Sequence, residues 1–167
     1  MITKIRAYGI PAPQGSKKHI GNGILIESSK KVRPWRKELL RATLDSSTYS
    51  GIIITKACSV HLEFLIPRPR SHYGTGRNKN KLKDSSPIFC TSLRNGDIDK
   101  LCRSTIDGLS EKSGGKLIKD DSLIVQLTVI KRYCLEGELP GALILLKEPD
   151  FFPVEKHIEN FVRRRWR

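Results

Sequence analysis

The 167-residue chain lacks any run of about eighteen apolar residues, so no segment is predicted to span a membrane. Its first residues also lack the apolar core and small-residue cleavage site of a signal peptide. Its four cysteines include no CxxC pair, which argues against a zinc site and favours reduced, buried thiols. We therefore expect a cytoplasmic protein with one domain, because the length suits a single core.

Acidic residues are scarce compared with basic ones. The chain has 31 Lys and Arg against 17 Asp and Glu, which leaves a net charge of +14. A field of this sign attracts polyanions, and nucleic acid is the most common polyanion in the cytosol. Ribosomal proteins have a similar composition, so the charge indicates a class of partner and does not indicate a reaction.

Apolar periodicity predicts an α+β fold, with one mixed β-sheet packed by helices. In residues 98–109 the apolar side chains recur every three or four positions, as on one face of a helix. The predicted strands lie at the chain start and at 52–66, 121–133 and 142–147, and the predicted helices lie at 34–46 and 98–110. We expect the domain to occupy residues 1–150, followed by a basic amphipathic tail over 151–167.

Residues 68–96 are predicted to form a long, mobile, basic loop. Loops of this length in compact domains are usually functional or disordered, and this one could lie along phosphates. A loop that is merely solvated would have the same composition. The expected DNA-binding residues are Lys17 and Lys18 after the first turn, and Arg68, Arg70, Arg77, Lys79, Lys81 and Lys83 in the loop.

Aspartates occur where two of the predicted elements begin. Asp97 and Asp99 start a helix, and Asp120 and Asp121 precede a strand. Singly, such residues are also typical of a helix cap or a turn. Together in a basic protein they favour a metal site, because Mg²⁺ takes carboxylate ligands. A bound Mg²⁺ would supply the charge stabilisation and activated water that phosphodiester hydrolysis needs.

Two cations follow the first aspartate pair. Lys100 or Arg103 could stabilise negative charge on the transition state or on the leaving oxygen. The constellation therefore predicts a metal-dependent nuclease, with Asp97, Asp99 and Asp121 as the catalytic carboxylates.

The carboxylate motifs lie among other distinctive segments. These are Pro11-x-Pro13-Gln-Gly15-Ser16-Lys17, His72-Tyr-Gly-Thr-Gly-Arg77-Asn78, Asp97-Ile-Asp99-Lys-Leu-x-Arg103-x-x-x-Asp107-Gly-Leu109, Asp120-Asp121-x-x-x-Val125 and Lys131-Arg132-Tyr133. With these segments the chain resembles the RusA-type Holliday junction resolvases, especially phage and prophage members. The resemblance runs from about Ile10 to Tyr133, and the arrangement of the two aspartate pairs across one helix is its most specific part.

The resemblance implies a RusA-like fold and a Mg²⁺-dependent endodeoxyribonuclease, with Mn²⁺ as an alternative ion. It implies a homodimer that makes paired cuts in branched double-stranded DNA at a four-way junction, in the cytoplasm of a bacterial host. Carried over by position, it implies that Asp97, Asp99 and Asp121 bind the metal, with Asp120 as an alternative ligand and Asp107 in a second shell around them.

The chain departs from the family pattern next to the first aspartate pair. The family often has an Asn after the second aspartate and a catalytic lysine three residues later, where this chain has Lys100 and Arg103. An arginine keeps the positive charge but does not release a proton at working pH. An electrostatic role is therefore expected for Arg103, and a general-acid role is in doubt.

Two other functions remain open from the residues. A non-enzymatic nucleic-acid-binding protein would explain the charge and the Arg-rich tail, but it would not explain the grouped aspartates. A nuclease that prefers flaps or forks would explain both. A PD-(D/E)xK nuclease fits poorly, because no (D/E)xK triplet follows Asp121 in the next strand.

Overall fold

The structure is a computed structural model. It describes residues 2–15, 17–19, 21, 23, 25–27 and 29–149, and for 17–19 and 25–27 it describes the backbone alone. The predicted tail over 151–167 and the side chains of Lys17 and Lys18 therefore lie outside the described residues.

The main sheet is mixed and has four strands, in the order β1 (Thr3–Tyr8), β6 (Gly141–Lys147), β4 (Cys58–Ile66) and β5 (Ile124–Tyr133). β5 runs parallel to β4, and the other neighbours are antiparallel. A parallel pair needs a long crossover, which here contains the helix α2 (Ile98–Leu109). The α+β fold predicted from the sequence is confirmed.

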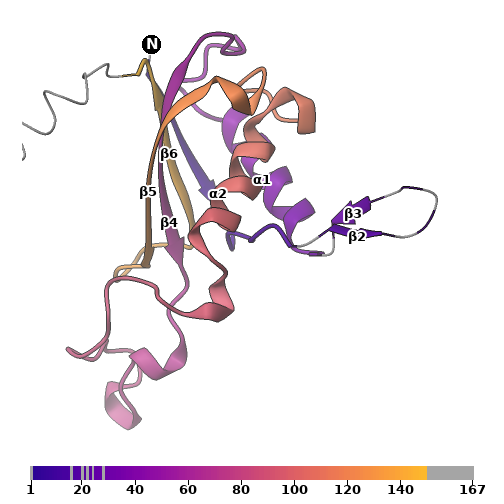
Figure 1. The fold of residues 1–167 in the computed structure, drawn as a ribbon. Coiled ribbons are helices and arrows are strands. Elements are labelled where there is room, and N and C mark those ends of the chain that lie inside the picture. The colour runs from indigo at the N-terminus through magenta and orange to yellow at the C-terminus, as the bar shows by residue number, and fades with distance from the viewer. Residues whose placement is uncertain are drawn as a thin grey trace, which may run out of the picture.

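Both helices cover the same face of this sheet (Figure 1). α1 (Val32–Leu44) packs on α2 and β1, and α2 also contacts β5. A short hairpin of β2 (Lys17–His19) and β3 (Leu25–Glu27) projects to the side of the helices (Figure 1). Among the described residues, no helix is long and apolar enough to cross a membrane.

The core lies between the helices and the sheet. Alternate residues of β4, such as Val60, Leu62 and Phe64, are fully buried, as expected for a central strand with one face under helices. Trp35 of α1 is also buried, and its Nε1–H donates to Thr105 Oγ1 of α2 at 3.0 Å. This bond ties the two helices together inside the core.

Element boundaries differ most from the prediction at the starts of two strands, and α1 begins and ends two residues before the predicted helix over 34–46. The strand predicted over 52–66 begins at Cys58, because residues 51–57 find only one bridge, between Ile54 and Ile118. The strand predicted from 121 begins at Ile124, after a 3-10 turn over Asp121–Leu123. In the first case the apolar residues extend beyond the paired part of the strand, and in the second the polar residues Asp121 and Ser122 form a turn instead.

The segment predicted as a loop over 68–96 has local structure. It contains 3-10 turns at Arg70–His72, Gly76–Asn78 and Leu93–Asn95, and an antiparallel bridge between Tyr73 and Leu82. Its mobility stays a prediction.

Replacing Trp35 with Phe is expected to lower the free energy of unfolding by about 1–3 kcal/mol, because a buried Thr105 hydroxyl loses its partner. Urea unfolding measures this change. Tyr49→Phe is the control, since the Tyr49 hydroxyl donates to the Lys116 carbonyl at 2.7 Å in an exposed bond. Equal losses in the two variants would contradict a role for the buried bond between the helices.

Candidate active site

A groove of about 530 Å³ runs between α2 and β5. Its apolar lining comes from both elements, and its polar lining comes from α2 and from the turn before β5. The lining residues are Ile98, Asp99, Cys102, Arg103, Ile106, Asp107, Asp121, Ile124, Leu127 and Val129. The structure thus places two of the predicted catalytic carboxylates, Asp99 and Asp121, in one groove with Arg103.

These two carboxylates lie toward opposite ends of the groove. The Lys131 Nζ, near the end of β5, donates to the Gly96 carbonyl just before α2 at 2.7 Å, so α2 starts beside the end of β5. Asp121 opens the turn Asp121–Leu123 that leads into β5, so it lies beside the other end of that strand. Among the described residues, no group of three or more His, Cys, Asp or Glu is placed to hold a metal ion.

Asp97 occupies the N-cap position of α2, but its side chain makes no capping hydrogen bond. Its Oδ2 instead accepts a hydrogen bond from Lys100 Nζ at 2.8 Å, and both side chains are about half exposed. The Lys100 hydrogen bond and charge, with a smaller contribution from Lys131, hold the pKa of Asp97 below its ordinary value. The same bond raises the pKa of Lys100. The pair is therefore ionised at neutral pH.

Asp99 and Arg103 lie one turn apart on α2 and both line the groove. The charge of Asp99 reaches Cys102, whose pKa rises to about 11, mainly through burial and secondly through Asp99. Arg103 is exposed, and its side chain forms no ion pair or hydrogen bond with the part of the chain that the structure describes. Its guanidinium is thus available to an anion in the groove.

The structure separates the roles of Asp120 and Asp121. Asp120 Oδ1 accepts the Ser122 backbone N–H at 3.0 Å and caps the turn before β5. Those hydrogen bonds from Ser122 lower the pKa of Asp120. Asp121 lines the groove, and Asp120 does not. The geometry therefore places Asp121 in the groove and gives Asp120 a capping contact.

Asp107 lines the groove but is already paired. Its Oδ2 accepts a hydrogen bond from Arg36 Nη2 of α1 at 2.6 Å. The same Nη2 lies 3.3 Å from Gln14 Oε1, and the Gln14 backbone N–H donates to the Lys100 carbonyl at 3.0 Å. The proline-rich segment before β2 is thus attached to the helix that carries Asp99, a contact that sequence reasoning missed.

Gly96 shows how closely this segment approaches α2. Its φ is +79°, and a Cβ at Gly96 would lie 2.5 Å from the Cβ of Pro13. Only glycine fits both the backbone angle and the space. The Asn-Gly pair before Asp97 was the available sequence signal for a positive φ at this position.

The expected DNA-binding residues of the loop fall into two groups. Arg68, Arg70 and Lys83 donate to backbone carbonyls. Arg77, Lys79 and Lys81 are exposed, and their side chains make no hydrogen bond or ion pair within the described residues.

Comparison with known families confirms the resemblance seen in the motifs. The family model described as Endodeoxyribonuclease RusA matches residues 9–144, which include the groove, both aspartate pairs and the basic segment. A comparison with curated proteins gave no match. The family is enzymatic, so the alternative of a non-enzymatic nucleic-acid-binding protein is not supported. The chain belongs to the RusA family of endodeoxyribonucleases.

Proposed function

We propose that this endodeoxyribonuclease resolves four-way DNA junctions by Mg²⁺-dependent hydrolysis, acting as a homodimer. One observation carries the proposal: an unpaired arginine, Arg103, shares a groove with Asp99 and Asp121 on a protein of net charge +14. Grouped acids repel the phosphates that such a protein attracts, unless a cation lies between them.

The donor set fits Mg²⁺ by its chemistry. Asp97 and Asp99 are exposed carboxylates at the start of α2, and Mg²⁺ is usually held by one or two carboxylates with water and phosphate oxygens. Mn²⁺ accepts the same ligands. When bound, the ion supplies an activated water and stabilises charge on the phosphate. On binding the metal, Asp97 would lose its hydrogen bond from Lys100. The Lys100 ammonium would then be free to lie beside the substrate.

The position of Asp121 is one argument for the homodimer part of the proposal. Within one protomer Asp121 lies at the far end of the groove from the first turn of α2, and the described residues gather no three acids. A second copy of the chain is a source of a further carboxylate. Two active sites in a symmetric dimer would also match the two strands that resolution of a junction must cut.

Arg103 is proposed to bind the phosphate at the cleavage site. Its planar guanidinium can donate two parallel hydrogen bonds to phosphate oxygens. Because arginine stays protonated, Arg103 would stabilise the negative charge on the phosphate and on the leaving oxygen. The leaving oxygen would receive its proton from water.

The experiment that tests the proposal compares a mobile four-way junction with a linear duplex of matched sequence, each with Mg²⁺ and with chelator. We expect symmetric nicks in the junction with Mg²⁺ and intact DNA in every other reaction. Flap and fork substrates form further arms. Faster cutting of flaps or forks would contradict junction preference, and cutting in chelator would contradict the metal requirement.

A further inference from the structure

The crossover between β4 and α2 contains a small folded projection, His72–Lys83, which we call the finger. The bridge between Tyr73 and Leu82 closes it. The Gly74 N–H donates to the Lys81 carbonyl at 3.0 Å, and the Lys83 N–H donates to the His72 carbonyl at 3.0 Å. In Figure 1 this part of the chain extends beyond the end of the sheet.

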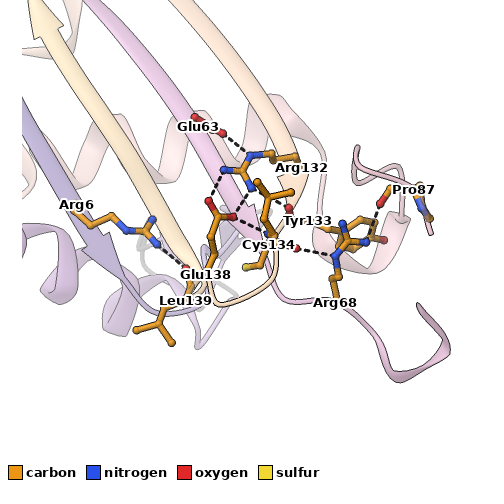
Figure 2. Close-up of polar contacts among 10 residues, drawn as sticks. Arg6, Glu63, Arg68, Pro87, Arg132, Tyr133, Cys134, Glu138 and Leu139 are labelled. Atoms are coloured by element: carbon orange, nitrogen blue, oxygen red, sulfur yellow. Dashed lines mark hydrogen bonds and ion pairs between the residues drawn. The ribbon is translucent and has the colours of Figure 1, made fainter. Parts of the chain in front are cut away.

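Arg68 attaches the base of the finger to the sheet. Its Nε donates to the Cys134 carbonyl at 2.7 Å and its Nη1 donates to the Pro87 carbonyl at 2.9 Å (Figure 2). The guanidinium also lies 5.5 Å from the centre of the Tyr133 ring, which His72 contacts edge-on at 4.6 Å. Arg68 is therefore a structural residue of this segment.

Two further cations stabilise the finger itself. Arg70 Nη1 donates to the Lys79 carbonyl, and Lys83 Nζ donates to the Ser71 carbonyl at 2.8 Å. Arg70 also lies over the Tyr73 ring, 5.9 Å from its centre. These bonds hold the two sides of the finger together and leave the tip as a defined turn at Gly76–Asn78.

The other three cations of the segment also lie within the finger, Arg77 in the turn at its tip and Lys79 and Lys81 after that turn. Arg77, Lys79 and Lys81 are exposed and find no side-chain partner within the described residues. Like charges on one small projection repel one another, so their grouping on the finger favours a polyanion as ligand.

The finger lies at the end of the molecule where α2 begins. The segment returns along the end of β5, where the Cys90 N–H donates to the Lys131 carbonyl at 3.2 Å. Lys131 in turn holds Gly96, the residue before Asp97. A DNA backbone that reaches Asp97 and Asp99 is thus at the same end of the molecule as the finger.

We propose that the finger is a preformed phosphate-binding element, in which Arg77, Lys79 and Lys81 contact the DNA backbone while Arg68, Arg70 and Lys83 maintain its shape. A finger that is already folded before binding loses less conformational entropy than a disordered strip of the same charge. The inference rests on the proposed function only in the choice of a four-way junction as one probe.

The test is the salt dependence of DNA binding in the presence of chelator, measured by fluorescence anisotropy with a labelled junction and a labelled duplex. The slope of log K against log salt concentration is negative, and each lost phosphate contact lowers its magnitude by about 0.9. We expect Lys79→Gln and Lys81→Gln each to lower the magnitude of this slope by about 1 for every bound finger, with an unchanged urea midpoint.

Lys83→Gln is the matched control, because it removes the same charge from the same finger. We expect its slope to stay at the wild-type value, since Arg68 and Arg70 still hold the base and sides of the finger. Equal slope changes for Lys81→Gln and Lys83→Gln would overturn the inference. Unchanged slopes for Lys79→Gln and Lys81→Gln would also overturn it. Equal affinity for junction and duplex, with the expected slope changes, would support the finger and contradict only the proposed junction preference.

Discussion

Replacing Asp99 with Asn is expected to slow DNA cleavage by about 10³-fold, which corresponds to roughly 4 kcal/mol of lost transition-state stabilisation. Asn keeps the shape of the side chain but removes the negative charge that a divalent ion needs. The affinity for a four-way junction is expected to be retained or increased, because a negative charge near phosphate is lost. Single-turnover cleavage and an anisotropy titration measure the two effects separately.

A change in folding cannot account for an effect of this size. Asp99 lies in the first turn of α2, where a negative charge is worth about 0.3–1 kcal/mol to the helix. Glu38→Gln is the control, since Glu38 forms an exposed ion pair with Arg41 on α1. Normal cleavage by the Asp99→Asn protein would show that the groove is not the active site.

The same comparison separates the two aspartates before β5. Asp121→Asn is expected to lose cleavage as Asp99→Asn does, because Asp121 lines the groove. Asp120→Asn is expected to retain cleavage, since Asn can still accept the Ser122 N–H that Asp120 accepts. The reverse result would assign the functional acid to Asp120.

Replacing Arg132 with Leu is expected to lower the free energy of unfolding by about 3–5 kcal/mol. The Arg132 guanidinium lies between two carboxylates (Figure 2), and its side chain is only 12% exposed. It donates to Glu63, and its Nη2 donates to Glu138 Oε1 at 2.9 Å. Without Arg132 these partly buried acids would lose their counter-charge.

Urea unfolding at pH 7 measures this loss, with Arg41→Leu as the control. The side chain of Arg41 is 63% exposed and pairs only at the surface with Glu38, so its replacement is expected to cost at most about 1 kcal/mol. Similar losses in the two variants would show that the Arg132 network contributes no more than a surface pair.

The pH dependence gives an independent readout of the same network. Hydrogen bonds from Arg132 are the main cause that lowers the pKa of Glu138 from 4.5 to about 2. A carboxyl group with a depressed pKa in the folded state stabilises the fold above its unfolded pKa. That contribution is lost as the pH falls from 4.5 toward 2. The stability difference between wild type and Arg132→Leu should therefore shrink over this range, and a constant difference would contradict the assignment.

The sequence by itself predicted the elements whose signal is local. The apolar stripe that includes Ile98, Leu101 and Leu109 predicted a helix over 98–110, and α2 spans Ile98–Leu109. The last strand, predicted over 142–147, is β6 over Gly141–Lys147. Periodicity works here because one buried face is enough to define each element. The family also followed from motifs, since the aspartate pairs and the early proline segment are short and continuous.

Only the tertiary structure decided where strands end and how the aspartates are arranged. Residues 52–54 are apolar, but continuous strand pairing begins only near Cys58, and Ile54 forms a single bridge with Ile118. The sequence separation of the two aspartate pairs does not show whether α2 and β5, which follow them, run in the same or in opposite directions. Because β5 starts beside the end of α2, Asp121 and Asp99 lie toward opposite ends of one groove.

The six cations of residues 68–83 show most clearly that the sequence alone does not reveal tertiary contacts. In the sequence Arg68 and Arg77 are equivalent, since both are basic residues in a polar segment. In the structure Arg68 donates to the Cys134 carbonyl, 66 residues away, whereas Arg77 lies at an exposed tip. Charge and polarity are properties of single residues, so the sequence by itself determined that this protein attracts polyanions. Which cations remain available to the DNA depends on the carbonyls that the fold brings to each of them.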